Sequence, residues 1–187
     1  MYKDNKHRCS WANPKNQLYL TYHDEEWGQP VREDDGYLFE MLLLESFQAG
    51  LSWECVLNKR ENFRQAFDGF DYRKISQYDE KKVAELRQDA GIIRNKRKIQ
   101  AAIENAKIFL EIQKEFGSFS SYIWGFTGGQ IIYENDKTSS DLSDRISKEL
   151  QKRGMRFVGT TIIYSFLQAI GMIYSHEEGC FMCVSHE

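Results

Sequence analysis

The distribution of proline constrains the fold of this chain more than any other feature of its sequence. The 187 residues contain only two prolines, Pro14 and Pro30, and both lie in the first sixth of the chain. Proline removes a backbone N–H and its ring clashes with the preceding turn, so it interrupts a helix. Every residue after Val31 is therefore free to be helical, and we expect an all-α architecture.

Hydrophobic periodicity and capping residues locate the helices within the proline-free part of the chain. Apolar residues recur there at the spacing of a buried helix face, and several segments follow Asp, Ser or Thr, which cap helix N-termini. The expected helices are 36–48, capped by Asp34 or Asp35; 53–67; 79–89, begun by Ser76 or Asp79; 96–116; 142–153, opened by Ser140 or Asp141; and the apolar stretch 162–173 after Thr160-Thr161. Residues 127–137 show no clear period, so we expect a loop.

Length and charge limit the class of protein. A chain of 187 residues suits one domain, or one domain with a small attached lobe, and it can bury a real core. No apolar run is long enough to cross a membrane and the first residues lack the apolar segment of a signal peptide, so we expect a cytoplasmic protein without membrane contact. The net charge of -3 gives no global attraction to nucleic acid, so an anionic partner would need a local basic patch.

Residues 45–53, Glu-Ser-Phe-Gln-Ala-Gly-Leu-Ser-Trp, place one carboxylate in a run with almost no other charge. Glu45 follows apolar residues that recur too densely for an exposed helix face, so we expect it to be partly buried. A buried carboxylate needs a hydrogen-bond donor from the protein or from a ligand. Ala49-Gly50 marks a point where the helix can end and a pocket can open beside Phe47 and Trp53. Two interpretations stay open: a functional acid, or a helix C-terminus whose carboxylate bonds to a nearby backbone amide.

Cysteines and histidines gather near the two ends of the chain. The four cysteines are too few and too unevenly placed for a disulfide framework, which favours metal binding or burial. Zinc prefers thiolates and imidazoles in a closed tetrahedral site, and Cys9, His23, His176 and Cys180 would form such a structural site and tie the termini together. Cys183 forms a Cys-x-x-Cys pair with Cys180 and could replace either histidine. The alternative is two unrelated clusters, and nothing indicates a catalytic metal.

Two basic turns could contact phosphates despite the net charge. In residues 89–98 a helix ends near Gly91, turns, and restarts at a basic N-terminus, and such a hairpin exposes backbone amides to an anion. Residues 152–161 also lead from a basic stretch into a helix start. Each turn alone is typical of solvated surface, but two in a chain of negative net charge favour a nucleic-acid partner.

Seven motifs follow one another in order and without a large gap. They are Cys9-x-Trp11; Tyr19-x-x-Tyr22-His23-Asp24-x-x-Trp27-Gly28; Leu38-Phe39-Glu40; Glu45-x-x-Gln48-Ala49-Gly50-Leu51-Ser52-Trp53; Asp89-Ala90-Gly91-Ile92-Ile93-Arg94-Asn95; Arg153-Gly154 with Phe157-Val158-Gly159-Thr160-Thr161; and His176-x-x-Gly179-Cys180. Such a set is highly specific, and from Cys9 to Cys183 it resembles the 3-methyladenine DNA glycosylase I family, the constitutive bacterial type within the helix-hairpin-helix glycosylase superfamily.

The resemblance implies a fold and a set of site residues. The fold would be one helix-hairpin-helix glycosylase domain over 1–187, in which a small zinc-binding lobe from about 1–30 and 170–187 joins the N- and C-termini and 31–170 form the helical core. The hairpin would lie at 91–95. The implied roles are catalysis by Glu45; a base pocket of Trp11, Tyr19, Tyr22 and Trp53; DNA binding by Leu51, near the gap left by the flipped nucleotide, and by Gly91, Arg94, Lys96, Arg97, Thr160 and Thr161; and structural zinc on Cys9, His23, His176 and Cys180, which excludes Cys183.

The chain departs from the wider superfamily at the hairpin. Gly-Ile-Ile-Arg replaces the usual Gly-x-Gly turn, and no aspartate follows where other members keep a catalytic one. The absence of that aspartate is also a feature of this family.

The resemblance implies a monomeric DNA repair enzyme that flips 3-methyladenine out of alkylated double-stranded DNA and hydrolyses its N-glycosidic bond. The products would be free 3-methyladenine and an abasic site. The alkylated base is cationic, so its bond is already weakened and little acid–base chemistry is needed. The enzyme must extrude the base, stack it on aromatic rings and read its edge. Cation–π attraction of about 0.5 to 2 kcal/mol favours the charged purine, and Glu45 can accept hydrogen bonds from the exocyclic amine.

Two other classes of protein remain as alternatives. A non-enzymatic helix-hairpin-helix module with a structural zinc predicts a filled core at Glu45 and no pocket. A small zinc-bound interaction domain without a DNA role leaves the two basic turns unexplained.

Overall fold

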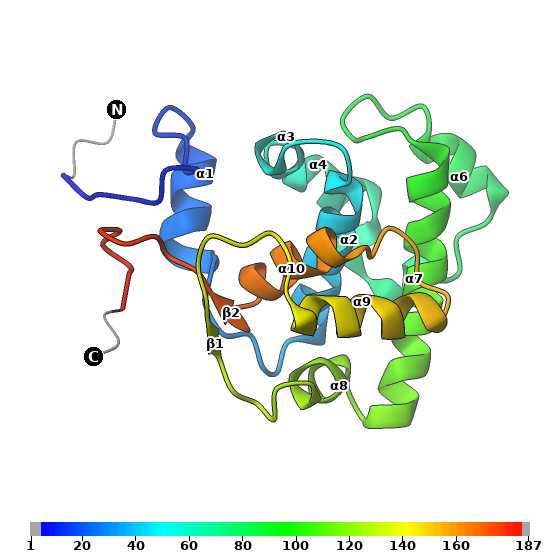
Figure 1. The fold of residues 1–187 in the computed structure, drawn as a ribbon. Coiled ribbons are helices and arrows are strands. Elements are labelled where there is room, and N and C mark those ends of the chain that lie inside the picture. The colour runs from blue at the N-terminus through cyan, green and yellow to red at the C-terminus, as the bar shows by residue number, and fades with distance from the viewer. Residues whose placement is uncertain (1–4, 185–187) are drawn as a thin grey trace.

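The computed structural model describes residues 5–184, and helices dominate it, as expected (Figure 1). Residues 1–4 and 185–187 of the expected zinc lobe lie outside the described range. The elements in chain order are α1 (Gln17–Thr21), the π-helix η1 (Tyr22–Glu26), α2 (Asp35–Gln48), α3 (Trp53–Leu57), α4 (Arg60–Ala66), the 3-10 helix η2 (Asp68–Phe70), α5 (Tyr72–Ile75), α6 (Glu80–Leu86), α7 (Lys96–Phe116), α8 (Phe119–Gly125), β1 (Ile132–Tyr133), α9 (Asp141–Lys152), α10 (Thr160–Ala169) and β2 (Ile173–Tyr174).

Helix α2 forms the centre of the core. Every residue from Leu38 to Phe47 is buried, and a helix that is buried on all sides must be surrounded by other elements. It packs against α3, α7, α8 and α10. Of the two candidate caps, Asp34 is the N-cap, because its side chain accepts a hydrogen bond from the backbone N–H of Tyr37 at 2.9 Å. Glu45 therefore projects from the most enclosed helix of the molecule.

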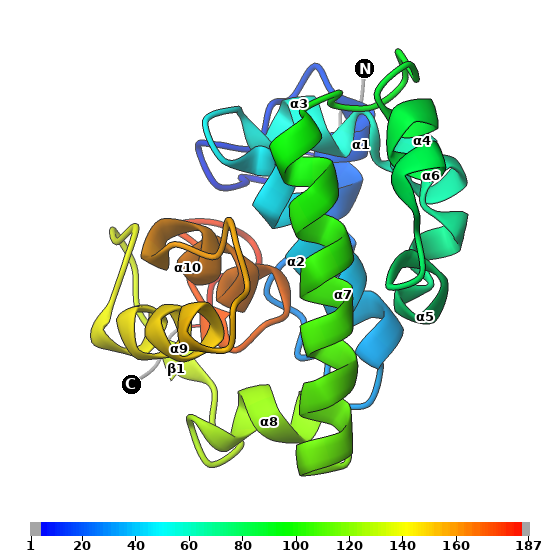
Figure 2. The ribbon, with the colours of Figure 1, turned by 90° about the vertical axis from the view of Figure 1, so that its right-hand side faces the viewer.

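Helix α7 runs along the whole molecule, with α9 and α10 on one side and α4, α5 and α6 on the other (Figure 2). Its bounds agree with the expected 96–116, and Asn95 caps it by accepting from the N–H of Lys98 at 3.2 Å. Helix α6 ends at Leu86, so α6, the turn 87–95 and α7 form a helix–turn–helix unit. Across residues 5–184, no helix is both long and apolar enough to span a bilayer.

The structure corrects several expected elements. The helix expected at 53–67 is two helices, because the chain turns at Lys59, whose ψ of 0° is not helical. The segment expected at 79–89 ends at Leu86, and α10 ends at Ala169 rather than continuing to 173. There the chain reverses at Gly171, with φ of +69°, where a Cβ would lie 2.3 Å from the carbonyl carbon of Gln29. Only glycine fits this approach.

A short parallel sheet also departs from the all-α expectation. Strand β1 lies within the segment 127–137, which was expected to be a loop, and it pairs with β2. Ile132 is opposite Ile173 and Tyr133 is opposite Tyr174. Strands of two residues are too short to show a period of two in the sequence. The sheet matters for the site because β2 leads directly to His176.

The two ends of the described chain lie side by side, next to α1 and β2 (Figure 1). The backbone N–H of Phe181 donates to the carbonyl of His7 at 2.8 Å, and the N–H of Ser10 donates to Glu177 Oε2 at 2.6 Å. These bonds bring the cysteines and histidines of both ends into one region.

Candidate active site

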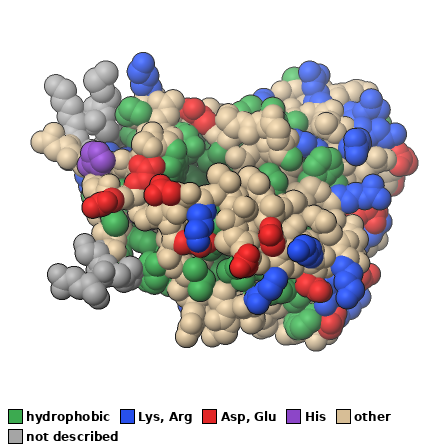
Figure 3. All heavy atoms as spheres, viewed as in Figure 1, with side chains coloured by type: hydrophobic (Ala, Val, Ile, Leu, Met, Phe, Trp, Pro, Cys, Tyr) green, Lys and Arg blue, Asp and Glu red, His purple; other side chains and the backbone are tan. Residues whose placement is uncertain are grey.

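A cavity of about 360 Å³ opens between η1, the end of α2, the start of α3, α10 and the loop after β1. In the space-filling view, a hollow with hydrophobic walls lies between α1 and α3 (Figure 3). The cavity is lined by Trp11, Tyr19, Tyr22, Trp27, Glu45, Gln48, Trp53, Asn135, Asp136, Lys137, Thr138, Ser165, Gln168, Ser175 and Glu177. All five residues expected to form the base pocket and its acid therefore line one cavity.

Glu45 is a buried acid whose carboxyl oxygen has no partner in the fold. It is 3% exposed, and its Oε2 accepts no hydrogen bond from any residue of the described chain. Burial raises the pKa of this carboxyl well above its ordinary value. The interpretation as a carboxylate bonded to a nearby backbone amide therefore does not describe Oε2. An unpartnered buried acceptor in a cavity is a group that a ligand can satisfy.

Aromatic rings form the cavity walls around this acid. The rings of Tyr22 and Trp53 lie 5.2 Å apart between centroids, and those of Trp11 and Tyr19 lie 5.3 Å apart. Burial and the negative charge of Glu45 raise the pKa of Tyr22, and burial together with Glu54 and Glu45 raises that of Tyr19 to about 12. Both phenols stay protonated at neutral pH, so these walls are neutral aromatic rings. The electron-rich faces of such rings, beside one carboxyl group, suit a flat cation.

Two further polar groups in the cavity also lack partners. Gln48 Oε1 and Trp53 Nε1 are buried and make no hydrogen bond with the described chain. Together with Glu45 Oε2, they offer two acceptors and one donor to a ligand. A non-enzymatic module predicts a filled core at Glu45, and this cavity contradicts that alternative.

Part of the cavity wall was not expected from sequence. Trp27 and Gln48 belong to the sequence motifs, but the family resemblance implied no role for them. Trp27 packs edge-on against Trp11 at 4.8 Å between centroids. The remaining wall residues come from the loop after β1, from α10 and from the segment after β2, and are Asn135, Asp136, Lys137, Thr138, Ser165, Gln168, Ser175 and Glu177. They are ordinary polar residues in their own segments, so only tertiary structure identifies them.

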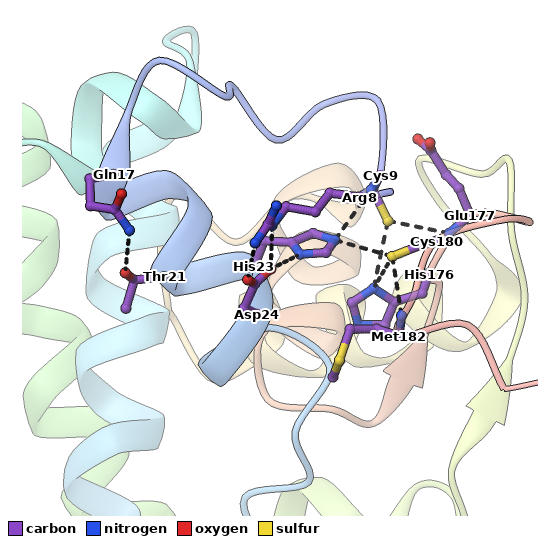
Figure 4. A network of polar contacts seen from close by, with 10 residues as sticks. All are labelled: Arg8, Cys9, Gln17, Thr21, His23, Asp24, His176, Glu177, Cys180 and Met182. Atoms are coloured by element: carbon purple, nitrogen blue, oxygen red, sulfur yellow. Dashed lines mark hydrogen bonds and ion pairs between the residues drawn. The ribbon is translucent and has the colours of Figure 1, made fainter. Parts of the chain in front are cut away.

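The expected metal ligands form a compact cluster (Figure 4). Cys9, His23, His176 and Cys180 are all buried, and their ligand atoms lie within 4.8 Å of one another. Cys180 Sγ lies 3.5 Å from His23 Nε2 and 3.6 Å from His176 Nδ1, and Cys9 Sγ lies 3.6 Å from His176 Nδ1. Cys183 lies outside this group.

The geometry and chemistry of the cluster fit a tetrahedral metal ion. Around a zinc ion with Zn–S of about 2.3 Å and Zn–N of about 2.0 Å, sulfur and nitrogen ligands lie about 3.5 Å apart. Backbone amides already approach the sulfurs, because Glu177 N–H donates to Cys9 Sγ at 3.3 Å and Met182 N–H to Cys180 Sγ at 3.5 Å. Burial lowers the pKa of His176 to about 4, so its imidazole is neutral and able to ligate.

A second layer of contacts holds His23 in place. His23 Nδ1 lies 2.8 Å from Asp24 Oδ1, which directs Nε2 toward the sulfurs. Arg8 binds the same carboxylate through two bonds of 2.8 and 2.6 Å (Figure 4). Burial alone would raise the pKa of Asp24, but Arg8 and His23 lower it below its usual value. The cluster thus has the carboxylate–histidine support typical of protein metal sites.

The cluster and the cavity share a wall. The ring of Trp11 lines the cavity and packs 5.2 Å from the ring of His23 between centroids. Glu177 also lines the cavity, while its backbone bonds to Cys9 Sγ. Gly28 closes the turn behind His176 with φ of +79°, and a Cβ there would lie 3.2 Å from His176 Nε2. Residues that contact the cluster therefore also form one side of the pocket.

The basic residues expected to contact DNA lie just before α7 and in its first turn. Arg94, Lys96 and Arg97 are exposed around the start of α7, and within residues 5–184 none of them pairs with a carboxylate. Lys and Arg side chains gather on the side of the molecule that carries α6 and the start of α7 (Figure 3). The turn is closely packed at Gly91, where a Cβ would lie 3.0 Å from Asp89 Oδ1 and 3.2 Å from Asn62.

Leu51, Thr160 and Thr161 lie outside the cavity. Leu51 is 43% exposed on the turn between α2 and α3. The first turn of α10 begins at Thr160, whose hydroxyl is already bonded to Ser143 Oγ at 2.8 Å, while Thr161 is exposed. A groove of about 740 Å³ that includes Arg97, Arg156 and Phe157 joins the first turn of α7 to the segment before α10. The two basic turns thus border one groove.

The chain is similar to known proteins along almost its whole length. The family model for methyladenine glycosylases matches residues 11–183. The chain is 46% identical over 179 residues to DNA-3-methyladenine glycosylase 1 of Escherichia coli (strain K12), which covers 92% of this chain and 95% of that protein. It is 39% identical over 180 residues to the DNA-3-methyladenine glycosylase of Haemophilus influenzae, covering 92% and 96%.

Solved structures agree in fold. A crystal structure of 3-methyladenine DNA glycosylase I superposes with a TM-score of 0.90 at 46% identity, covering 94% of this chain and 99% of the other. A Staphylococcus aureus 3-methyladenine DNA glycosylase I, solved for 3-methyladenine recognition, superposes with a TM-score of 0.90 at 32% identity, covering 96% and 98%. The cavity with its buried acid, the order of the motifs and these matches lead to one conclusion: the chain belongs to the methyladenine glycosylase family.

Proposed function

We propose that this protein is a DNA repair glycosylase that flips 3-methyladenine out of alkylated duplex DNA and hydrolyses its N-glycosidic bond, leaving an abasic site. The observation that carries the proposal is the unpartnered, buried Glu45 in an aromatic cavity. The family membership and the names of its relatives support the same activity.

The pocket chemistry suits a cationic purine. The positive charge weakens the glycosidic bond, so the protein has to bind and orient the base more than to protonate it. Glu45 is costly to ionise while its cavity is empty of cations, because nothing nearby offsets the buried charge. A cationic base with an exocyclic amine supplies both the charge and the donor. Normal adenine has the donor without the charge, so the pocket discriminates against it.

We propose that Cys9, His23, His176 and Cys180 hold a structural zinc ion. A closed site with two thiolates and two imidazoles supplies folding stability and leaves no open position for substrate. Its role toward the reaction is then indirect, through the wall that Trp11 and Glu177 share with the pocket.

We propose that the helix-hairpin-helix unit of α6 and α7 binds DNA through Gly91, Arg94, Lys96 and Arg97, and that Leu51 fills the gap in the duplex. The exposure of Leu51 and of the basic side chains supports this assignment. Thr160 and Thr161 would contribute through the backbone at the start of α10. We also propose that the protein acts as a cytoplasmic monomer with one domain, as expected from its sequence and its family resemblance.

Release of free 3-methyladenine from methylated duplex DNA tests the function. The parent protein should release the base well above the spontaneous rate, and an equal amount of the Glu45→Gln variant should release it much more slowly. The matched control is heat-denatured parent protein, because this lesion also depurinates without enzyme. Release by the folded parent at the spontaneous rate would refute the assignment.

A further inference from the structure

Lys98 is a buried cation at the junction of the hairpin and the pocket helix. It lies in the first turn of α7, directly after the exposed basic residues, yet it is only 6% exposed. Its Nζ donates to the backbone oxygen of Phe47 at 2.8 Å and to that of Ala49 at 2.6 Å. Both carbonyls belong to the end of α2, so one ammonium group connects the hairpin to the helix that carries Glu45.

The contact is more than a helix cap requires. The last carbonyls of a helix lack intrahelical partners, and a cation near them is favourable. Helices usually satisfy these carbonyls with a glycine turn or an exposed basic side chain, neither of which needs a buried charge. Burial lowers the pKa of Lys98, which reflects the cost of placing an ammonium in the interior. The burial of this charge therefore calls for a role beyond capping.

The surroundings of Lys98 indicate that role. Beyond Ala49 the chain turns at Gly50, with φ of +78°, and presents the exposed Leu51. On its other side, Lys98 Nζ lies 5.9 Å from the ring centroid of Phe157. Phe157 has φ of +56°, a strained conformation for an aromatic residue, in the loop that leads to α10. Lys98 therefore lies among the hairpin helix, the Leu51 turn and the loop before α10.

The turn of the hairpin is tied to the same side of the molecule. Lys59 Nζ donates to the carbonyl oxygen of Gly91 at 3.2 Å, and Asn62 Nδ2 donates to it at 3.3 Å. Lys59 and Asn62 belong to the region of α4, so the hairpin is fixed at its tip by these bonds and at its base by Lys98. Of these contacts, only the one at Lys98 reaches the helix that lines the pocket.

We propose that Lys98 is a positioning residue for base extrusion: it holds the Leu51 turn and the pocket end of α2 in fixed register with the hairpin bound to the DNA backbone. The inference rests on the proposed function. Without Lys98 the hairpin can still bind a duplex and the pocket can still bind a base, but the two sites lose their common geometry. Small displacements of reacting groups reduce rates strongly even when binding survives.

The test compares Lys98→Met with Lys114→Met, which removes an exposed lysine from the last turn of the same helix. Three quantities are measured for each: affinity for free 3-methyladenine from tryptophan fluorescence, affinity for undamaged duplex DNA, and the single-turnover rate of excision from methylated duplex. In Lys98→Met we expect both affinities to stay within about twofold of the parent and the excision rate to fall about tenfold or more. Lys114→Met should match the parent in all three.

Two results would overturn the inference. One is an excision rate in Lys98→Met equal to that of the parent; the other is a loss of free-base affinity in proportion to the rate, which would indicate a merely structural role. If Lys98→Met does not fold, Lys98→Gln is measured in the same way, and an unchanged rate in that variant also overturns the inference. Failure of the parent to release 3-methyladenine refutes the proposed function instead, so the two failures are distinguishable.

Discussion

At the scale of single residues, Glu45 shows what sequence can and cannot predict. Its burial follows from the dense apolar residues around it, and the structure confirms that burial at 3% exposure. The missing partner of Oε2 could not be predicted, because it depends on what surrounds the side chain in space. Trp53 shows the same limit: its place in the motif was visible in the sequence, while its unpartnered Nε1 was not.

Substitution of Glu45 by glutamine tests the pocket. Glutamine keeps the shape but replaces an acceptor-only group with one that also donates, and it removes the charge that favours a cationic base. We expect kcat/KM for excision to fall by roughly 1 to 3 kcal/mol of transition-state stabilisation. Zinc content and affinity for undamaged duplex should be unchanged, as measured by metal analysis and by titration. Excision at the parent rate would show that Glu45 does not contact the base.

The raised pKa of Glu45 also predicts the pH dependence of excision. Because burial raises this pKa, the carboxyl becomes protonated at a pH above that of an ordinary glutamic acid. Excision that needs the carboxylate should decrease as the pH falls through the raised pKa, by about tenfold per pH unit on the acid limb of kcat/KM. The spontaneous rate is subtracted at each pH. Glu45→Gln should lack this limb, and a variant with the same acid limb as the parent would assign the titration to another group.

Folding stability should respond to the titration of Glu45 in the opposite direction from excision. A carboxyl with a raised folded-state pKa binds more protons in the folded than in the unfolded protein, so its contribution to stability is present below the unfolded pKa and is lost as the pH rises through the folded pKa. The melting temperature of Glu45→Gln minus that of the parent should therefore be more positive at pH 8 than at pH 4. An equal difference in melting temperature at both pH values would contradict a raised pKa.

At the scale of elements, long amphipathic helices could be predicted and short or interrupted ones could not. Helix α7 has the expected bounds, because its 21 residues carry several turns of apolar spacing. The break between α3 and α4 at Lys59 could not be predicted, since no proline or glycine marks it. In the fold, Lys59 Nζ donates to the carbonyl oxygen of Gly91, a tertiary contact that the local sequence does not reveal. Likewise, β1 and β2 exist because their segments meet in space.

The hairpin provides a prediction at this scale. Replacing Arg94, Lys96 and Arg97 together by glutamine should weaken binding to any duplex and lower the dependence of log Kd on log salt by about 3 units, because each phosphate contact releases close to one counterion. Binding is measured with undamaged duplex DNA over a series of salt concentrations.

The matched control replaces exposed lysines away from the hairpin. Lys74, Lys114 and Lys148 are exposed and lie on α5, the last turn of α7 and α9. Replacing them by glutamine changes the net charge equally, so a general electrostatic effect would appear in both variants. A salt dependence that is the same in the two triple variants would remove the hairpin from the DNA interface.

At the scale of the whole molecule, the fold brings the ends of the chain together at one wall of the pocket. The cavity is lined by residues from Trp11 to Glu177, so the docked terminal segments complete one of its walls. The sequence indicated this closure through its cysteines and histidines, but the loop from Asn135 to Thr138 gave no such signal. Its place over the cavity depends on the pairing of β1 with β2.

Loss of the metal cluster should therefore affect stability before it affects pocket chemistry. Cys9→Ala should abolish stoichiometric zinc, and the free energy of unfolding should fall by about 4 kcal/mol, as for a site filled at about 1,000 times its Kd. For a chain of this size, this corresponds to a melting temperature lower by roughly 10 °C.

Cys183→Ala is the matched control, because Cys183 lies outside the cluster, and it should keep both zinc and stability. The fraction of Cys9→Ala that remains folded should still bind free 3-methyladenine, since Glu45 and Trp53 are held by α2 and α3 rather than by the termini. Freshly purified parent protein without zinc, or loss of zinc in Cys183→Ala alone, would mean that the ligand set is wrong.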